Sequence, residues 1–177
     1  MCCVVIRGKL GRPSRTGSSD GIALIEFSLV APIGFLLILS IIVGCVVITN
    51  LVQLTNAARD GARAAAICGS VSTAQMPDGS GTCSDTAVAA YITSHLSAIP
   101  AGSVLPQIYV CTPSEAAAGT CTSAGVRGIA NCQRGRIVEV DMYYDQPLYI
   151  PLLSTFFQTN PDGTRRLNAS AEATCEQ

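Results

Sequence analysis

Charge is scarce in this chain, and so are the residues that build most catalytic sites. Only 13% of the 177 residues are charged, whereas about a quarter are charged in an ordinary soluble domain. The single histidine, His95, lies in no recognisable nucleophile motif, and the sequence has neither a P-loop nor a G-x-G-x-x-G segment. These absences argue against an enzyme, and we expect no cofactor.

The cysteines lack the spacing of a zinc site. Zinc sites usually bring C-x₂₋₄-C pairs, but the six cysteines in the C-terminal part of the chain are 15, 28, 10, 11 and 43 residues apart. An even number of cysteines in a small exported domain indicates disulfides. Proximity in sequence suggests that Cys68 pairs with Cys83, and Cys111 with Cys121 or Cys132. We expect no metal, and the disulfide candidates are Cys68, Cys83, Cys111, Cys121, Cys132 and Cys175.

A long apolar run lies near the N-terminus. Ile22 to Ile48 is 27 residues with one formal charge, Glu26, and about 20 such residues span a bilayer. A cleaved secretory signal fits poorly, because its apolar core is only about 7–15 residues long. Basic residues before a span mark its cytoplasmic side, and this flank contains Arg7, Lys9, Arg12 and Arg15.

The helix of this span is expected to continue beyond the membrane. Apolar and small residues recur every three or four positions after Ile48, which is helical periodicity, and Gly69 is a plausible stop after Ile67. We expect a kink or a locally melted turn at Pro32 and Gly34. The recurring positions are Val47, Leu51, Leu54, Ala58, Ala62 and Ala65.

The outer part predicts a small mixed domain. A second helix is expected over 85–99, with Asp85 or Thr86 as its N-cap. Alternating residues predict strands over 136–145 and 165–175, but leave open which face of 136–145 points inward. The predicted fold is α+β: a long N-terminal helix, its first half spanning the membrane, packed with a disulfide-stapled antiparallel sheet of about three strands and one further helix. The remaining segments are a strand at 106–111, an irregular stretch at 69–86, an insertion at 112–135 and an apolar connector at 147–157.

These elements divide the chain into four parts. The outer part is mildly acidic, with ten acids and seven arginines after the apolar run, so we expect no nucleic-acid partner. The predicted parts are a basic cytoplasmic leader (1–21), a transmembrane helix (22–48), an outward extension of that helix (49–67) and an extracytoplasmic α+β domain (68–177).

The leader and the start of the apolar run form a recognisable junction. If the chain is cut between Gly21 and Ile22, Glu26 becomes the fifth residue and the aromatic Phe27 follows it. This pattern resembles a type IV prepilin signal, which a membrane prepilin peptidase cleaves. Tight-adherence pilins often carry tyrosine after the glutamate, and Phe27 keeps the ring without the hydroxyl.

Two further segments resemble the TadE-like family of tight-adherence pilus pseudopilins. The helix end "NAARDGARAAA" carries Asn56, Arg59, Asp60, Gly61 and Arg63, and the tail "RRLNASAEATCEQ" is similar to the closing strand of that family. The resemblance implies a bacterial cytoplasmic-membrane protein with a cytoplasmic N-terminus. It also implies partners: a prepilin peptidase, other pilins and the pilus assembly platform, and membrane lipid.

A physical argument gives Glu26 a role in assembly. A charged side chain at the bilayer centre costs about 2.5–3.5 kcal/mol on insertion scales. Cleavage would create an α-amino group, cationic at neutral pH, one helical turn away. Pairing with this amine, in the same or a neighbouring subunit, would offset much of the cost. Glu26 would then fix the alignment of neighbouring subunits during assembly. An acidic residue that snorkels to the interface is the alternative.

Three functions remain open from the sequence. The leading one is a minor pilin or pseudopilin acting in assembly or at the tip of a tight-adherence pilus, because an outer domain of 110 residues (68–177) exceeds what the resemblance implies for a major subunit. The second is an uncleaved single-pass anchor that displays an adhesive or binding domain. The third is a secreted enzyme or inhibitor that uses the helix only for export.

Arg59 and Arg63 lie four residues apart on one helix face. They are too far beyond the predicted membrane edge for headgroup contact, about 16 Å or more. We expect them to pair with acids of the outer domain, Glu139 or Asp141, or to be solvated.

Overall fold

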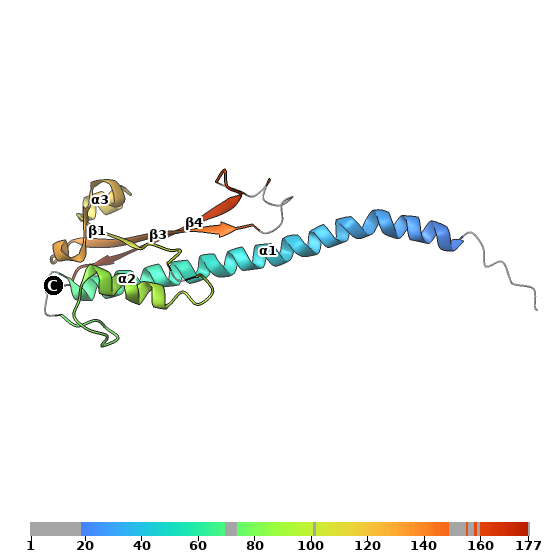
Figure 1. The fold of residues 1–177 in the computed structure, drawn as a ribbon. Helices are drawn as coiled ribbons and strands as arrows, with labels where there is room; N and C mark the ends of the chain where they lie inside the picture. The colour runs from blue at the N-terminus through green and yellow to red at the C-terminus, as the bar shows by residue number, and fades with distance from the viewer. Residues whose placement is uncertain are drawn as a thin grey trace, which may run out of the picture. The chain divides into compact units, whose positions relative to one another are not determined.

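The fold is a long helix followed by a small α+β domain, here in a computed structural model (Figure 1). The structure describes residues 19–69, 74–100, 102–148, 155, 158 and 160–176. The chain forms two compact units, Met1–Ile41 and Ile42–Gln177. The elements are, in chain order, α1 (Ser19–Cys68), α2 (Asp85–Ser94), β1 (Gln107–Cys111), α3 (Pro113–Ala117), α4 (Cys121–Ala124), β2 (Val126–Arg127), the 3₁₀ helix η1 (Ile129–Asn131), β3 (Ile137–Pro147) and β4 (Thr164–Thr174).

Helix α1 runs without a break through Pro32 and Gly34, so of the two alternatives expected there the locally melted turn is wrong, and the kink stays a prediction. The helix ends close to the predicted residue. Gly69 adopts a positive φ of 51° and its N–H donates to Ala65 O at 3.0 Å. This is a helix end that glycine adopts more readily than other residues.

The sheet is fully antiparallel, in the order β2-β1-β3-β4. The three predicted strands and the overall α+β architecture are confirmed. The fourth strand, β2, contributes two residues from the 112–135 insertion and was not predicted. A strand this short has no alternation to detect, and it exists because it pairs with Tyr109 and Val110 of β1.

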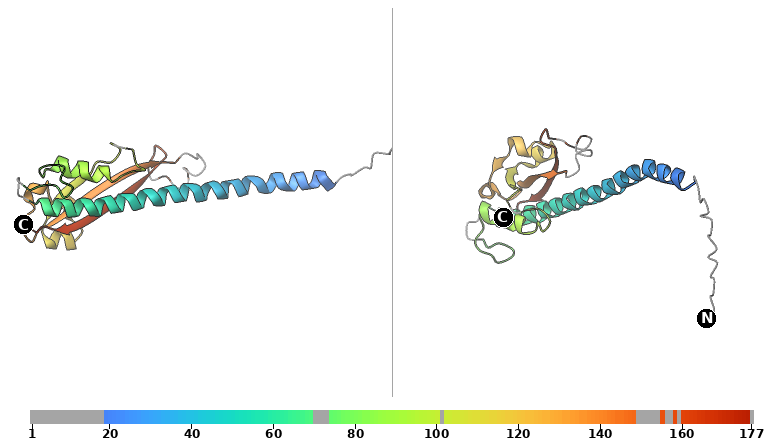
Figure 2. Two further views of the ribbon diagram at one scale, coloured as in Figure 1. Left: turned by 90° about the horizontal axis from the view of Figure 1, so that it is seen from below. Right: turned by 45° about the vertical axis from the view of Figure 1, so that its right-hand side comes forward.

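Long-range packing decides which face of β3 points inward. Val138, Val140 and Met142 are fully buried and join one core with Leu54 and Ala58 of α1. Figure 2 shows the C-terminal half of α1 running along the sheet. The alternate residues, Glu139 and Asp141 among them, therefore lie on the sheet face turned away from α1.

Helix α2 differs from its prediction at both ends. The N-cap is Ser84, whose Oγ accepts from Ala87 N at 3.1 Å. Asp85 instead accepts from Ile129 N at 2.8 Å and so ties α2 to η1. The helix stops at Ser94 and not at 99, and Gln53 Oε1 of α1 accepts a hydrogen bond from Ala98 N. The segment after α2 is thus bonded to α1 in a non-helical form.

The insertion at 112–135 is ordered by local chemistry. Thr112 and Glu115 form a capping box that starts α3, with Pro113 at its first position. A small second core of Tyr109, Cys111, Ala116 and Cys121 fastens α3 and α4 to the outer face of β1. Most of the apolar connector predicted at 147–157 falls outside the described residues.

Candidate functional site

The first turns of α1 carry the residues of the predicted cleavage junction. Because α1 begins at Ser19, the Gly21–Ile22 bond lies in its first turn and Glu26 follows Ile22 by four helical residues. That spacing is about 6 Å along the axis and places both residues on one face. Glu26 and Phe27 are exposed, Phe27 by 69%.

The helix around Glu26 presents an apolar surface. Ile25, Leu29 and Ile33 are each more than 60% exposed. By length and composition, α1 is able to cross a membrane. A carboxylate in this setting has no water to solvate it once the helix is in lipid, so its ionised form needs a cation nearby.

The helix-end segment, Asn56 to Arg63, separates into two faces. Asn56, Arg59 and Arg63 are exposed, whereas Gly61 is buried. A Cβ built on Gly61 would overlap the Cγ1 and Cδ1 atoms of Ile92 in α2. The small residue is therefore required for α1 and α2 to approach, and this part of the motif acts in packing.

Neighbouring alanines serve the same purpose toward the rest of the domain. The side chains of Ala57, Ala58, Ala62, Ala64 and Ala65 are at most 1% exposed. Such short side chains let the helix backbone come close to its neighbours along one side of the helix. The motif thus builds one continuous core between α1, α2 and the sheet.

The predicted pairing of Arg59 or Arg63 with Glu139 or Asp141 is wrong. No ion pair joins these four described residues. The arginines lie on the outer side of α1, and the acids lie on the sheet face turned away from α1, so the layer of the sheet separates them.

Those acids crowd one another on the outer face of the sheet, beside the part of β1 that α3 and α4 cover. Glu139 lies directly opposite Glu172 of β4, and Asp141 is two residues along β3. Partial burial, followed by the charges of Glu172 and Asp141, raises the pKa of Glu139. Like charges directly opposite in a sheet are destabilising.

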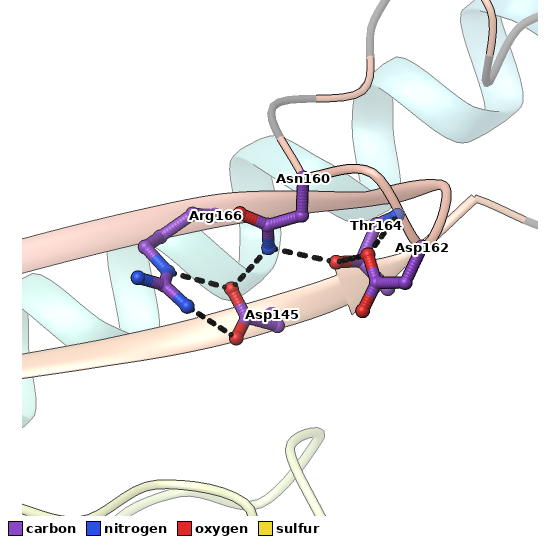
Figure 3. A network of polar contacts seen from close by, with 5 residues as sticks. All are labelled: Asp145, Asn160, Asp162, Thr164 and Arg166. Atoms are coloured by element: carbon purple, nitrogen blue, oxygen red, sulfur yellow. Dashed lines mark hydrogen bonds and ion pairs between the residues drawn. The ribbon is translucent and has the colours of Figure 1, made fainter.

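A polar network closes the ends of β3 and β4 (Figure 3). Arg166 binds Asp145 through two parallel hydrogen bonds of 2.8 and 2.9 Å, and Asn160 Nδ2 donates to Asp145 Oδ1 at 2.8 Å. The Arg166 bond, and then the Asn160 bond, lower the pKa of the Asp145 carboxyl. Thr164 donates from both N and Oγ1 to Asp162, which ties the turn before β4.

Arg166 also stacks on an aromatic ring of the same outer face of the sheet. Its guanidinium carbon lies 4.7 Å from the ring centre of Tyr143, a distance typical of a cation–π contact. Sequence reasoning missed this cluster. The signal was the alternation of β3 and β4, which puts Tyr143, Asp145 and Arg166 on one face once the strand register is known.

A buried amide pair joins α1 to β3 at this same end of the strand, but on the opposite face of the sheet. Asn50 Nδ2 donates to Gln146 Oε1, and both residues are about 5% exposed or less. Gln146 Nε2 donates onward to Pro147 O at 3.2 Å. A cavity of about 360 Å³ lies beside them, lined by Cys45, Val46, Thr49, Asn50, Ala98, Pro100, Tyr144 and Gln146.

All six cysteines of the outer part form disulfides. Cys68 pairs with Cys83, and Cys132 pairs with Cys175. Cys111 pairs with Cys121, which selects one of the two partners left open by the sequence. Cys68–Cys83 holds the end of α1, Cys111–Cys121 holds the small outer core, and Cys132–Cys175 holds the end of β4.

The family model described as TadE-like protein matches residues 21–63. The match covers the predicted cleavage junction, the apolar helix and the helix-end segment, and the resemblance is confirmed over these residues. It ends before the outer domain, so the similarity expected for residues 136–177 lies outside it. No curated protein and no solved structure shows a significant match to the chain.

Proposed function

Because residues 21–63 resemble the TadE-like family, we propose that this protein is a membrane-anchored minor pilin or pseudopilin. It would take part in the assembly or at the tip of a tight-adherence pilus. The family is not an enzyme family, and its pilus role suggests other pilins as partners. Membrane anchoring follows from the same segment, whose apolar helix is able to cross a bilayer.

One observation carries the proposal. The single carboxylate of the apolar segment 22–48, that of Glu26, lies one helical turn after the predicted new N-terminus at Ile22. A prepilin peptidase would free an α-amino group that has a pKa of about 8 and is therefore cationic at neutral pH. The pair would offset the cost of the buried charge and would align neighbouring helices, because the pair forms only in one register.

The four parts of the chain follow as part of this proposal. Residues 1–21 are the cytoplasmic leader that is removed, and 22–48 anchor the protein. Residues 49–67 carry the helix outward, and 68–177 form the extracytoplasmic domain.

The decisive experiment is the N-terminal sequence of the mature protein. We expect the full-length chain, expressed with a prepilin peptidase, to begin at Ile22, and to keep its leader in cells without the peptidase. An intact leader in the presence of an active peptidase would contradict the proposal. It would favour the second candidate, an uncleaved single-pass anchor, for which the disulfide-stapled outer domain is the supporting observation.

A matched pair of variants separates assembly from cleavage. Glu26→Ala is expected to remain in the membrane but to be lost from isolated pili, because the charge pair can no longer form. Ser28→Ala is the control, since Ser28 is also exposed on this segment and its hydroxyl donates to Ile25 O of its own helix. Normal incorporation of Glu26→Ala would remove the assembly role of the carboxylate.

A further inference from the structure

Two oppositely charged surfaces lie on opposite sides of the compact unit Ile42–Gln177. The first, here called the basic stripe, consists of Arg59 and Arg63 on the exposed side of α1. The second, here called the acidic face, consists of Glu139, Asp141 and Glu172 on the sheet face turned away from α1. The core between α1 and the sheet separates the two surfaces, so they do not meet within one chain.

The three acids of the acidic face lie on the same sheet face as Arg127 and Arg166, but both arginines are bound elsewhere. Among the described residues no ion pair involves Glu139, Asp141 or Glu172. Arg127, which lies across β1 from Glu139, donates instead to Gln107 Oε1 at 2.9 Å and to the Tyr109 hydroxyl at 3.1 Å. The raised pKa of Glu139 reflects the same crowding of uncompensated acids.

The two surfaces lie at the same height along the domain. The Asn50–Gln146 hydrogen bond provides a common reference level on α1 and β3. From this level, Arg63 lies about 20 Å along the helix. Asp141 and Glu139 lie about 17 and 23 Å along β3, which runs beside it. The spacing of the arginines, about 6 Å, is close to that of the two acids, about 7 Å.

We propose that the acidic face of one copy of this protein binds the basic stripe of a second copy. The charges are complementary and their spacing matches, and pairing Arg59 with Asp141 and Arg63 with Glu139 needs a displacement of only about 3 Å along the helix axis. The contact is heterologous, so each end copy keeps one free surface and the contact repeats. The contact requires only two copies of this chain, so it does not depend on the proposed pilus function. If that function holds, the contact would add a lateral bond outside the membrane.

The amino-acid composition permits a selective test. The sequence contains a single lysine, Lys9, which lies in the basic leader. Arg63→Lys keeps the charge of the stripe and adds an amine that a zero-length carbodiimide reagent joins to a touching carboxylate. Full-length Arg63→Lys protein, half of it ¹⁵N-labelled, is mixed in detergent and cross-linked. Mass spectrometry then distinguishes links between copies from links within one copy, because only the former join a labelled to an unlabelled peptide.

We expect mixed-label links from position 63 to peptides that contain Glu139, Asp141 or Glu172. Arg134→Lys is the matched control, because Arg134 is exposed outside the stripe, and it should give no such links. Links found only within one chain, links to other carboxylates, or no links at position 63 would each overturn the proposal.

Charge reversal provides an independent measurement. Arg59→Glu/Arg63→Glu should weaken self-association in sedimentation equilibrium by about tenfold or more, since two attractive pairs become repulsive. Asp141→Arg/Glu172→Arg should weaken it similarly, and mixing the two variants should restore wild-type affinity. Failure of the mixture to associate would contradict the pairing. The cross-linking and sedimentation results do not depend on whether the leader is cleaved. The N-terminal sequence of the mature protein tests the proposed function alone.

Discussion

Gly61 of α1 and Ile92 of α2 lie so close that no side-chain carbon fits between them. Ile92 is fully buried, so its side chain could make room only by displacing other groups of the core. The position of α2, and through it the contact of Asp85 with η1, therefore depends on one hydrogen atom in place of a methyl group.

Gly61→Ala is accordingly expected to destabilise the outer domain. Overpacking of a closed core costs about 1–3 kcal/mol, partly offset by up to about 1 kcal/mol of helix propensity. Thermal unfolding of the full-length chain in detergent measures the difference. Gly44→Ala is the control on the same helix, because nothing lies within 4 Å of its built Cβ, and it should be neutral or stabilising. Destabilisation of both variants alike would show that the contact with Ile92 is not the cause.

The buried Asn50–Gln146 pair makes a second prediction. Asn50→Leu leaves the Gln146 amide without its partner in a closed site, which costs about 1–3 kcal/mol. The double variant Asn50→Leu/Gln146→Leu removes both polar groups and should regain part of this loss. A double-mutant cycle by chemical denaturation measures the coupling. Strictly additive effects of the two substitutions would refute the coupling.

The three disulfides should contribute unequally to stability. The Cys132–Cys175 bridge closes a loop of 43 residues and Cys111–Cys121 closes one of 10. Loop-closure entropy predicts about 4 kcal/mol for the longer loop and about 3 kcal/mol for the shorter one. Paired Cys→Ser variants compared by thermal unfolding check this order. A larger loss from Cys111→Ser/Cys121→Ser would indicate that packing of the small outer core outweighs the entropy of the loop.

The crowding of acids around Glu139 predicts that the stability of the folded chain depends on pH. The pKa of Glu139 is raised in the folded state, so between its ordinary value and the raised one the folded chain holds a proton that the unfolded chain has lost. The contribution of Glu139 to stability therefore falls as the pH rises through this window.

Glu139→Gln removes that dependence. The free energy of unfolding of the variant should equal that of wild type near pH 4. At pH 7 it should be higher by up to about 1 kcal/mol, because the substitution relieves a like-charge cross-strand pair. Unfolding at both pH values in dilute detergent solution measures the difference. Glu176→Gln, at an exposed position, should show no such gain. Equal stability of Glu139→Gln and wild type at pH 7 would contradict the electrostatic account.

Local signals in the sequence predicted several elements well. The periodicity from Val47 to Ala65 located the extension of α1, and Gly69 marked its end. Alternation located β3 and β4 to within about two residues. The capping box at Thr112 and Glu115 was also a local signal, and it would have predicted α3.

The sequence by itself determined the elements whose cause is local: the apolar helix with Glu26 one turn from Ile22, and the strands whose side chains alternate. Only the tertiary structure decided that Cys111 pairs with Cys121, that the Val138 face of β3 points inward, and that Arg59 and Glu139 are kept apart. The physical reason is that periodicity depends on neighbours along the chain. The choice of a buried face or a disulfide partner depends instead on packing between residues far apart in sequence, here imposed by the close contact of α1 with α2 and the sheet.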